Sequence, residues 1–548
     1  MRTTGLNLVL PEIYQVIRTE VATRPDDAKR WLASLPFLNV TETGRLIFSS
    51  LKDLNRLPID DGQRLKLMEL YRQPVSTISR ALQKNYIGLP VPISREDRPI
   101  AEQVQQFQVE MAHGYLRVAQ NAARKPTLSH SEQNTVALAI QRGIHYLTEL
   151  LVKSYELYAP YPPGCWRDIH QLYRHAERLG VTETHVSDPL NGAIKHSSVA
   201  HVYKQALLLA LSNPYRLPPR MLANIHRYLD RWASYAKLTQ PSKELQHSCQ
   251  FLINLHEDCA GFGGTEGLAI AHDAPYRLLI TLDLTRVLHA QYTTLRDGKI
   301  PPSEGLEKDF FNSESMEMLR FLIGAWGIKP KRVFARVARH DDHLDLAIGI
   351  ENINYFINGG QDFLPSNTEV GPPRRNARPQ MQRKLLPSKS NQARELTAWR
   401  LVDESASGIA LRKHANGTGQ LRIGELLALR QASRNSNGKW NLAVVRWIKS
   451  TENDEIEMGI QRLAPSVEPR AIQADTPHDP RKTLIPILFL PSLGAMKQPA
   501  TLVTPRGVYR PDRVLIVDDG YRARRVAATR LLQINRSFEQ FEFKPIDA

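Results

Sequence analysis

The chain has 548 residues, of which 42% are apolar and 23% are charged, and its formal net charge is +16. This length is enough for three or four domains with their own cores, while no apolar run reaches the roughly 18 to 20 residues that a membrane span needs. The N-terminus does not have the pattern of a secretion signal and three cysteines argue against a disulfide framework, so we expect a cytoplasmic protein with no membrane span.

Residues 1–261 are predicted to form an α-helical scaffold that binds a partner. Apolar residues recur at three- and four-residue spacing, and Asp60 and Ser131 stand where helix-start signals belong. Turn sequences such as YPPG separate the periodic segments. The expected helices cover residues 62–82, 99–124, 131–158, 165–179, 197–211 and 219–237.

The next region, residues 262–360, is mixed. Helices are expected at 275–295 and 313–324, followed by a β-hairpin over 332–353, where apolar and polar residues alternate on both sides of a polar midpoint. The hairpin pattern repeats at an offset of 110 residues, which places Gly349 on Gly459. This match indicates either generic hairpin patterning or a second, degenerate barrel related to a later one.

The last third of the chain is predicted to be β-rich. Residues 361–395 are a flexible Arg-rich linker, 396–465 a small barrel, 466–486 a second linker and 487–548 a C-terminal β-rich unit. The expected barrel strands are 397–403, 409–414, 426–430, 440–449 and 455–463. The fold class is therefore multidomain α+β, with an all-α region followed by two β-rich units.

Positive charge is concentrated around the predicted barrel. Between residues 371 and 450 there are sixteen Lys or Arg against four acids, a net charge of +12. Such a window would attract phosphates. Its ordinary alternative is a solvated, soluble surface.

Groups that could carry enzymatic chemistry are weakly indicated. His247, Cys249, His256 and Cys259 have zinc-ligand chemistry, but their surroundings favour a core helix. A His- and Asp-rich run at 340–345 falls at the tip of the expected hairpin, where polar residues are usual. The sequence contains no phosphate-binding G-x-x-x-x-G-K-[ST] motif and no G-x-S-x-G motif. We expect no catalytic residues, no metal and no cofactor.

The stretch WRLVDESASGIALR has a small polar group between two strand-like runs. Asp403, Ser405 and Gly408 form the pattern D-x-S-x-x-G. A carboxylate can accept hydrogen bonds from the N–H edge of guanine, and glycine lets a ring approach the backbone. The alternative is a Ser or Asx turn that closes a hairpin, with Gly408 supplying a positive φ.

Upstream of this stretch, Arg374 and Arg378 form R-x-x-x-R in the Arg-rich linker. Arginine forks grip phosphates or guanine O6 and N7. The pairing of the two motifs, followed by a Val-Val-Arg-Trp strand (444–447) and a Met-Gly-Ile strand (458–460), resembles the PilZ family. PilZ domains are six-stranded barrels that bind cyclic di-GMP. The whole layout is similar to FimW-type receptors, which are linked to surface attachment and pili.

The resemblance implies a binding site for cyclic di-GMP. Arg374 and Arg378 would hold guanine edges and phosphates, and Asp403, Ser405 and Gly408 would form the floor.

In the PilZ family the arginines usually lie directly before the first barrel strand, whereas here Pro379 and PSKSNQARE intervene. Arg375, Arg383 and Lys384 are therefore alternatives for the arginine positions.

The resulting expectation is a non-catalytic cyclic di-GMP receptor in the cytoplasm, which could be recruited to a protein machinery at the cell envelope or at the cell pole. Its helical part would bind a protein partner that the sequence does not identify, and its role would lie in pilus assembly, motility or surface attachment. The alternative is a nucleic-acid-binding protein that uses the basic window. That alternative needs exposed aromatics for base stacking. Trp399, Trp440 and Trp447 instead follow strand patterns that suit a core, which makes nucleic acid the less favoured partner.

Overall fold

The computed structural model describes the chain in two compact units. The helical unit comprises Met1–Leu89 and Ile93–Lys331, and the barrel unit comprises Pro90–Pro92 and Arg332–Ala548. The description leaves out residues 1–5, 16–19, 126, 242–247, 264–274, 304–305, 308, 328–336, 339–341, 367–393, 416–420, 432–438, 452, 474–483, 495–497 and 547–548.

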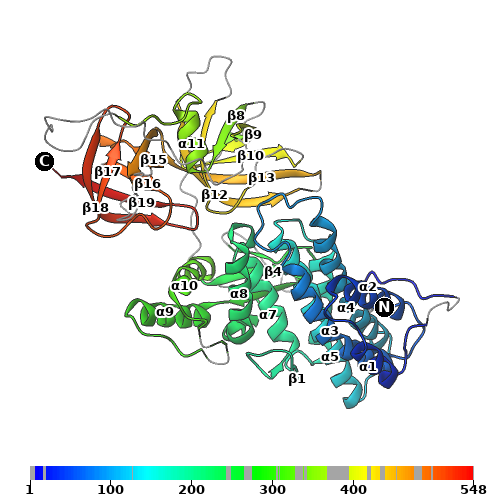
Figure 1. The fold of residues 1–548 in the computed structure, drawn as a ribbon. Coiled ribbons are helices and arrows are strands. Elements are labelled where there is room, and N and C mark those ends of the chain that lie inside the picture. The colour runs from blue at the N-terminus through cyan, green and yellow to red at the C-terminus, as the bar shows by residue number, and fades with distance from the viewer. Residues whose placement is uncertain are drawn as a thin grey trace, which may run out of the picture. The chain divides into compact units, whose positions relative to one another are not determined.

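Ten α-helices of the described residues form the helical unit, and α3, α4 and α5 pack side by side (Figure 1). Asp60 caps α3 as expected, whereas the cap of α5 is Ser129, two residues before the predicted one. Ser129 and Glu132 form a reciprocal capping box that satisfies free N–H groups of the first turn. The helices are α1 (Pro25–Ala33), α2 (Val40–Leu54), α3 (Asp61–Gln83), α4 (Arg98–Ala122), α5 (His130–Glu156), α6 (Cys165–Leu179), α7 (Val199–Leu211), α8 (Pro219–Trp232), α9 (Leu282–Arg296) and α10 (Ser313–Trp326).

Two short sheets complete this unit. One pairs β1 (Val186–Ser187) with β2 (His196–Ser197), and the other has the order β3-β6-β4-β5. The core helix expected around Cys249 to Cys259 is wrong, because Phe251, Leu252 and Ile253 are buried in strand β4. A short apolar run fits a buried strand as well as a helix. The strands of the second sheet are β3 (Lys237–Thr239), β4 (Gln250–Asn254), β5 (Phe262–Gly263) and β6 (Tyr276–Ile280).

The mixed region that we expected at 262–360 is divided between the two units. Its first strand, β6, and helices α9 and α10 contribute Leu279, Leu288 and Trp326 to the same hydrophobic core as the earlier helices. The expected helix over 275–295 begins only at Leu282, because β6 occupies its first part. The boundary predicted at residue 261 therefore does not separate two cores.

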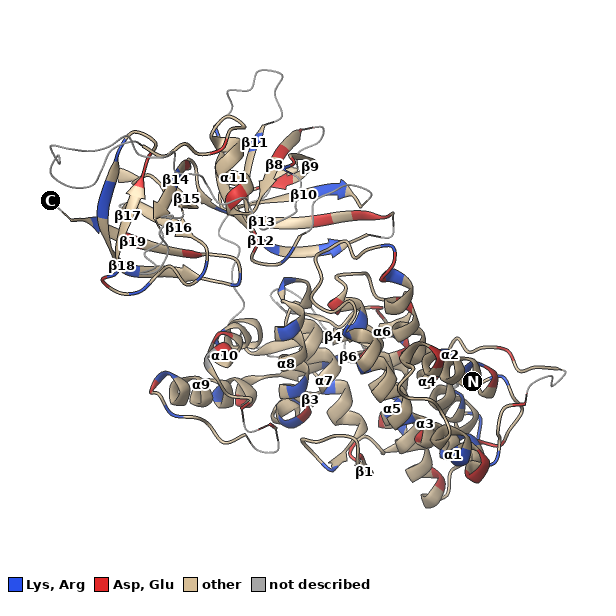
Figure 2. Cartoon of the chain, viewed as in Figure 1, with Lys and Arg blue, Asp and Glu red and all other residues tan. Residues whose placement is uncertain are grey.

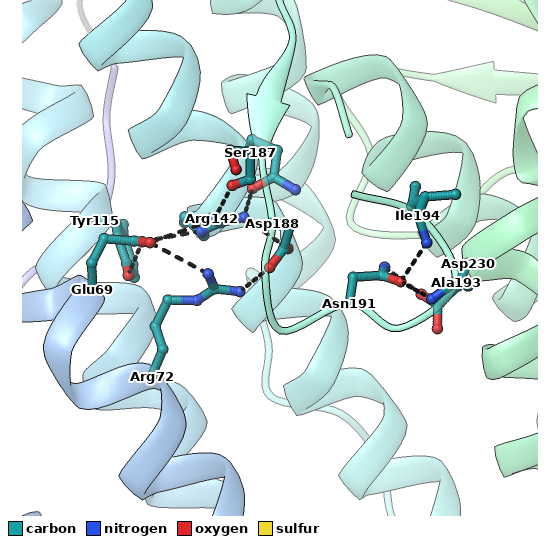
Figure 3. A network of polar contacts seen from close by, with 11 residues as sticks. Glu69, Arg72, Tyr115, Arg142, Ser187, Asp188, Asn191, Ala193, Ile194 and Asp230 are labelled. Carbon is teal, nitrogen blue, oxygen red and sulfur yellow. Dashed lines mark hydrogen bonds and ion pairs between the residues drawn. The ribbon is translucent and has the colours of Figure 1, made fainter. Parts of the chain in front are cut away.

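A ring of buried ion pairs joins three parts of the helical unit (Figure 3). Asp188 accepts hydrogen bonds from Arg72 at 2.8 Å and from Arg142 at 2.9 Å. Both arginines also contact Glu69, at 3.3 and 3.1 Å. Burial by itself would raise the pKa of Asp188, but the charges of Arg142 and Arg72 outweigh burial and hold this pKa below its ordinary value. The ring ties the β1–β2 connection to α3 and α5.

Replacing Asp188 by alanine should lower the free energy of unfolding of the helical unit by about 3 to 5 kcal/mol, because it leaves two buried arginines without one of their carboxylates. Urea denaturation followed by far-UV circular dichroism measures this loss. Because the pKa of Asp188 is lowered on folding, its contribution is complete above about pH 4 and is lost as the pH falls further.

The control is Asp27→Ala, which removes an exposed ion pair with Arg30 and should cost less than about 1 kcal/mol. Equal losses in the two variants would show that the buried ring does not anchor the unit.

The middle barrel of the barrel unit closes through six strands. The ring order is β9-β10-β13-β12-β11-β8, and β8 pairs back with β9. The five strands expected between residues 397 and 463 are confirmed. The strands are β8 (His343–Ile348), β9 (Thr397–Glu404), β10 (Gly408–His414), β11 (Leu426–Gln431), β12 (Asn441–Ser450) and β13 (Glu455–Ala464).

The β-hairpin expected over 332–353 is wrong. Strand β7 (Val337–Ala338) and strand β8 both pair antiparallel with β9 and run along it in the same direction. The alternating residues therefore belong to two strands that pair with the same edge of β9, and residues 339–341 between them lie outside the described residues. Since β8 also pairs with β11, it belongs to the middle barrel and not to a second, degenerate one. The predicted barrel boundary at residue 396 misses this strand.

The C-terminal unit is a second closed barrel, in the order β14-β15-β16-β19-β18-β17. The linker predicted at 466–486 is wrong, because it contains β14 and the first residues of β15. Pro469 and Pro486 suggested a linker, yet each lies where its strand is paired on one edge among the described residues. The strands are β14 (Glu468–Gln473), β15 (Leu484–Leu490), β16 (Thr501–Thr504), β17 (Val514–Asp518), β18 (Ala523–Ile534) and β19 (Glu539–Pro545).

The two barrels share a hydrophobic core. Leu426 and Val444 of the middle barrel belong to the same buried cluster as Leu488 and Phe538 of the C-terminal barrel. Helix α11 (Ile350–Ile357) lies in this cluster, and its buried Asn354 donates hydrogen bonds to the carbonyls of Arg470 and Ile487, at 2.9 and 2.8 Å. A buried amide with both bonds made fixes the position of the helix on the second barrel.

A fragment that starts at residue 370 and ends at 467 lacks β8 and half of the shared core. Its strands β9 and β11 would each expose an unpaired edge, so we expect no cooperative thermal unfolding from it and a tendency to aggregate. A fragment of residues 332–548 keeps both barrels and should unfold cooperatively. Differential scanning calorimetry of the two fragments tests this, and a cooperative transition in the shorter one would contradict the assignment of β8.

Candidate site at the turn between β9 and β10

Asp403, Ser405 and Gly408 lie together where β9 turns into β10. The Ser405 amide donates to the Gly408 carbonyl at 2.8 Å, and the Gly408 amide donates back to the Ser405 hydroxyl oxygen at 3.2 Å. The Ser405 hydroxyl is also 3.1 Å from the Gly408 carbonyl oxygen. Asp403 lies in β9, opposite Ala410 of β10, and its side chain is half-buried. The structure therefore brings three of the five predicted site residues into one turn.

Gly408 is required by a close approach and not by its φ angle. It is not among the described glycines with a positive φ, so the interpretation that it supplies one is wrong. A Cβ atom at this position would lie 2.9 Å from the carbonyl oxygen of Ile460 in β13. Any side chain would push β10 away from β13 at the start of their pairing.

Arg462 is a residue of this site that the sequence did not indicate. Its backbone amide donates to the Ser407 carbonyl at 3.1 Å, and its guanidinium donates to the Ser405 carbonyl at 3.0 Å. The same guanidinium forms an ion pair with Glu404. Strand periodicity shows which face a residue lies on but not which loop a long side chain reaches, so no signal in the sequence identified it.

The charge around the barrel is more balanced than the sequence window suggested. Figure 2 marks basic residues (blue) on β10 and acidic residues (red) on β13. Arg412 pairs with Glu457 at 3.0 Å, and Arg430 pairs with Asp345 at 3.3 Å. These acids lie outside residues 371–450, which is why the count of +12 overstated the field of the barrel itself.

The three tryptophans of the window are not equally buried. Trp399 is 2% exposed, and its indole N–H donates to Thr397 at 3.0 Å. Trp440 and Trp447 are partly exposed; the Arg430 guanidinium lies 4.7 Å from the ring centre of Trp440. The Trp447 ring covers Gly459, where a Cβ atom would lie 1.8 Å from the indole nitrogen. The expectation that all three suit a core is thus confirmed for Trp399, which is buried, and for Trp440, which packs against the core that the two barrels share.

Arg374, Arg378 and the alternative cations Arg375, Arg383 and Lys384 lie outside the described residues, so the structure does not test their roles.

The described residues next to 367–393, here called the Arg-rich segment, contact other side chains of the barrel unit. Buried Asp518 accepts hydrogen bonds from the Ser366 amide and hydroxyl, both at 3.0 Å. On the other side, Arg394 pairs with Asp362 at 2.6 Å and lies 4.4 Å from the ring centre of Tyr355. The hydrogen bond to Asp362 raises the pKa of Arg394. Ser366 and Arg394, which border residues 367–393, therefore both have partners within the barrel unit.

Metal chemistry gains no support from the described residues. They contain no group of three His, Cys, Asp or Glu side chains placed to hold a metal ion. Cys259 contacts Glu257 at 3.5 Å, whereas His247, His340 and Asp341 lie outside the described part of the chain.

Among the described residues, none of the helices combines the length and the apolar character needed to cross a membrane.

A closed six-stranded barrel that carries D-x-S-x-x-G at a turn between two strands defines a PilZ-type domain. Three family models match successive parts of the chain: the N-terminal domain of the cyclic-di-GMP receptor FimW (residues 26–243), its middle PilZ domain (368–469) and the FimW C-terminal beta-barrel domain (471–546). The chain therefore belongs to the FimW family. The middle match begins after β8, so the strand that closes the barrel lies outside it.

A relative of known name supports this assignment along the whole chain. The cyclic-di-GMP receptor FimW of Pseudomonas aeruginosa is 27% identical to it, over 95% of this chain and 90% of its own length.

Proposed function

We propose that the chain is a non-catalytic cyclic di-GMP receptor whose ligand contacts the turn between β9 and β10. The observation that supports this most directly is the closed turn of Ser405 and Gly408 on a PilZ-type barrel, with Asp403 beside it near the end of β9. The related receptor is named for the same ligand. The receptor needs no cofactor or metal, since recognition relies on hydrogen bonds and charge.

In the proposed complex, Asp403 accepts hydrogen bonds from the N–H edge of guanine, while Arg374 and Arg378 grip phosphates or the opposite guanine edge. Ser405 and Gly408 shape the floor on which the base lies. The absence of a side chain at Gly408 preserves the pairing of β10 with β13 directly below this floor.

The receptor is proposed to act in the cytoplasm by coupling ligand binding to a protein partner of the helical unit. Recruitment to a cell-envelope machinery and a role in pilus assembly, motility or surface attachment follow from the family resemblance.

The alternative of a nucleic-acid surface is less favoured. Arg412, Arg430 and Arg462 of the middle barrel have carboxylate partners. Trp399 is buried, and although Trp440 and Trp447 are partly exposed, Arg430 lies over the ring of Trp440 and the ring of Trp447 packs on Gly459. Base stacking needs aromatic faces that are open to the solvent.

Replacing Asp403 by alanine should weaken the binding of cyclic di-GMP about 10- to 150-fold, because a charge-assisted hydrogen bond contributes roughly 1.5 to 3 kcal/mol. Isothermal titration calorimetry on the full chain measures this. Binding of a duplex oligonucleotide should be unchanged or slightly stronger, since the substitution removes a negative charge.

Asp345→Ala is the matched control, because it removes one carboxylate from β8 of the same barrel, away from the turn. It should bind cyclic di-GMP as the parent does. Undiminished binding by Asp403→Ala would exclude Asp403 from the site.

A further inference from the structure

Arg462 of strand β13 contacts the β9–β10 turn with both its side chain and its backbone. Arg462 contacts three residues of the turn: Glu404 through an ion pair, the Ser405 carbonyl through its guanidinium and the Ser407 carbonyl through its backbone amide. Its side chain is 32% exposed. A planar guanidinium can donate in two directions at once, whereas an ammonium behaves as a point charge.

These contacts bear directly on Asp403. Glu404 and Ser405 are the two residues that follow it, and both are held by the guanidinium of Arg462. The remaining bonds of the turn join Ser405 to Gly408. Those bonds close the turn on itself. At its β10 end, Gly408 also faces Gln461 in the pairing with β13, so the side chain of Arg462 supports the other end of the turn, at Glu404 and Ser405.

We propose that Arg462 is a positioning residue of the cyclic di-GMP site: it fixes the β9–β10 turn in its binding conformation before the ligand arrives. This inference rests on the proposed function. Ordering a loop on binding reduces affinity, so a turn that is already ordered retains more of the interaction energy with its ligand.

The barrel offers a closely matched control. Arg412 of β10 forms an ion pair with Glu457 of β13 at 3.0 Å, and the two side chains are 31% and 25% exposed. The corresponding values for Arg462 and Glu404 are 32% and 30%. Arg412→Met and Arg462→Met therefore remove similar ion pairs from the same barrel. The two pairs are equally and only partly exposed, so both substitutions should change the melting temperature by similar, small amounts.

The first measurement is calorimetric titration of the full-length variants with cyclic di-GMP. Arg462→Met should bind about 3- to 12-fold more weakly than the parent, the range expected when side chains must be ordered on binding. Arg412→Met should bind within about twofold of the parent. Arg462→Lys should fall between the parent and Arg462→Met, and it also serves as the test variant if Arg462→Met does not fold.

The second measurement is amide hydrogen exchange of the ligand-free proteins. Exchange at Ser405 and Gly408 should be faster in Arg462→Met than in the parent, and unchanged in Arg412→Met, because only the first variant loses the side-chain contacts to Glu404 and Ser405.

Unchanged affinity in a folded Arg462→Met would overturn the inference. Weaker binding without faster exchange at the turn would also overturn it, since Arg462 would then act by touching the ligand. Failure of the parent protein to bind cyclic di-GMP would instead contradict the proposed function, so the two failures are distinguishable.

Discussion

The pairing of β8 with both β9 and β11 is the constraint on which the barrel unit depends. Without β8 the remaining five strands have two open edges, and the sheet does not close. Because β8 precedes the Arg-rich segment in the chain and β9 follows it, closure brings both sides of that segment onto one barrel. The described residues at its two ends, Ser366 and Arg394, both contact side chains of the barrel unit.

The same closure connects the middle barrel to the C-terminal one. Helix α11 follows β8 and packs in the core that the two barrels share, where Asn354 bonds to two carbonyls of the second barrel. Asp518 of that barrel then holds Ser366. The C-terminal barrel thus holds Ser366, just before the Arg-rich segment. The shared hydrophobic core and the buried hydrogen bonds of Asn354 explain why the two barrels form one compact unit.

Strand alternation predicted five strands of the middle barrel, and D-x-S-x-x-G marked the turn, because both signals are local. The sixth strand was assigned to a hairpin, since the polar residues between β7 and β8 resemble a turn and its partners β9 and β11 lie about 50 and about 80 residues away in the sequence. Strand β14 was not predicted for a similar reason. A proline such as Pro469 is compatible with a strand when its side of the strand is unpaired, and the sequence does not show which side is paired. Arg462 was not predicted because its side chain contacts Glu404 and Ser405, which are distant in sequence and belong to another pair of strands.

The most direct test of the account is calorimetric titration of the full-length protein with cyclic di-GMP at 150 mM salt, with GMP and a duplex oligonucleotide as competitors. The account predicts saturable binding of cyclic di-GMP that neither competitor displaces, because short, partly buried contacts are screened less than contacts with a long polyanion. Displacement of cyclic di-GMP by the duplex, or no binding of the dinucleotide at all, would contradict it.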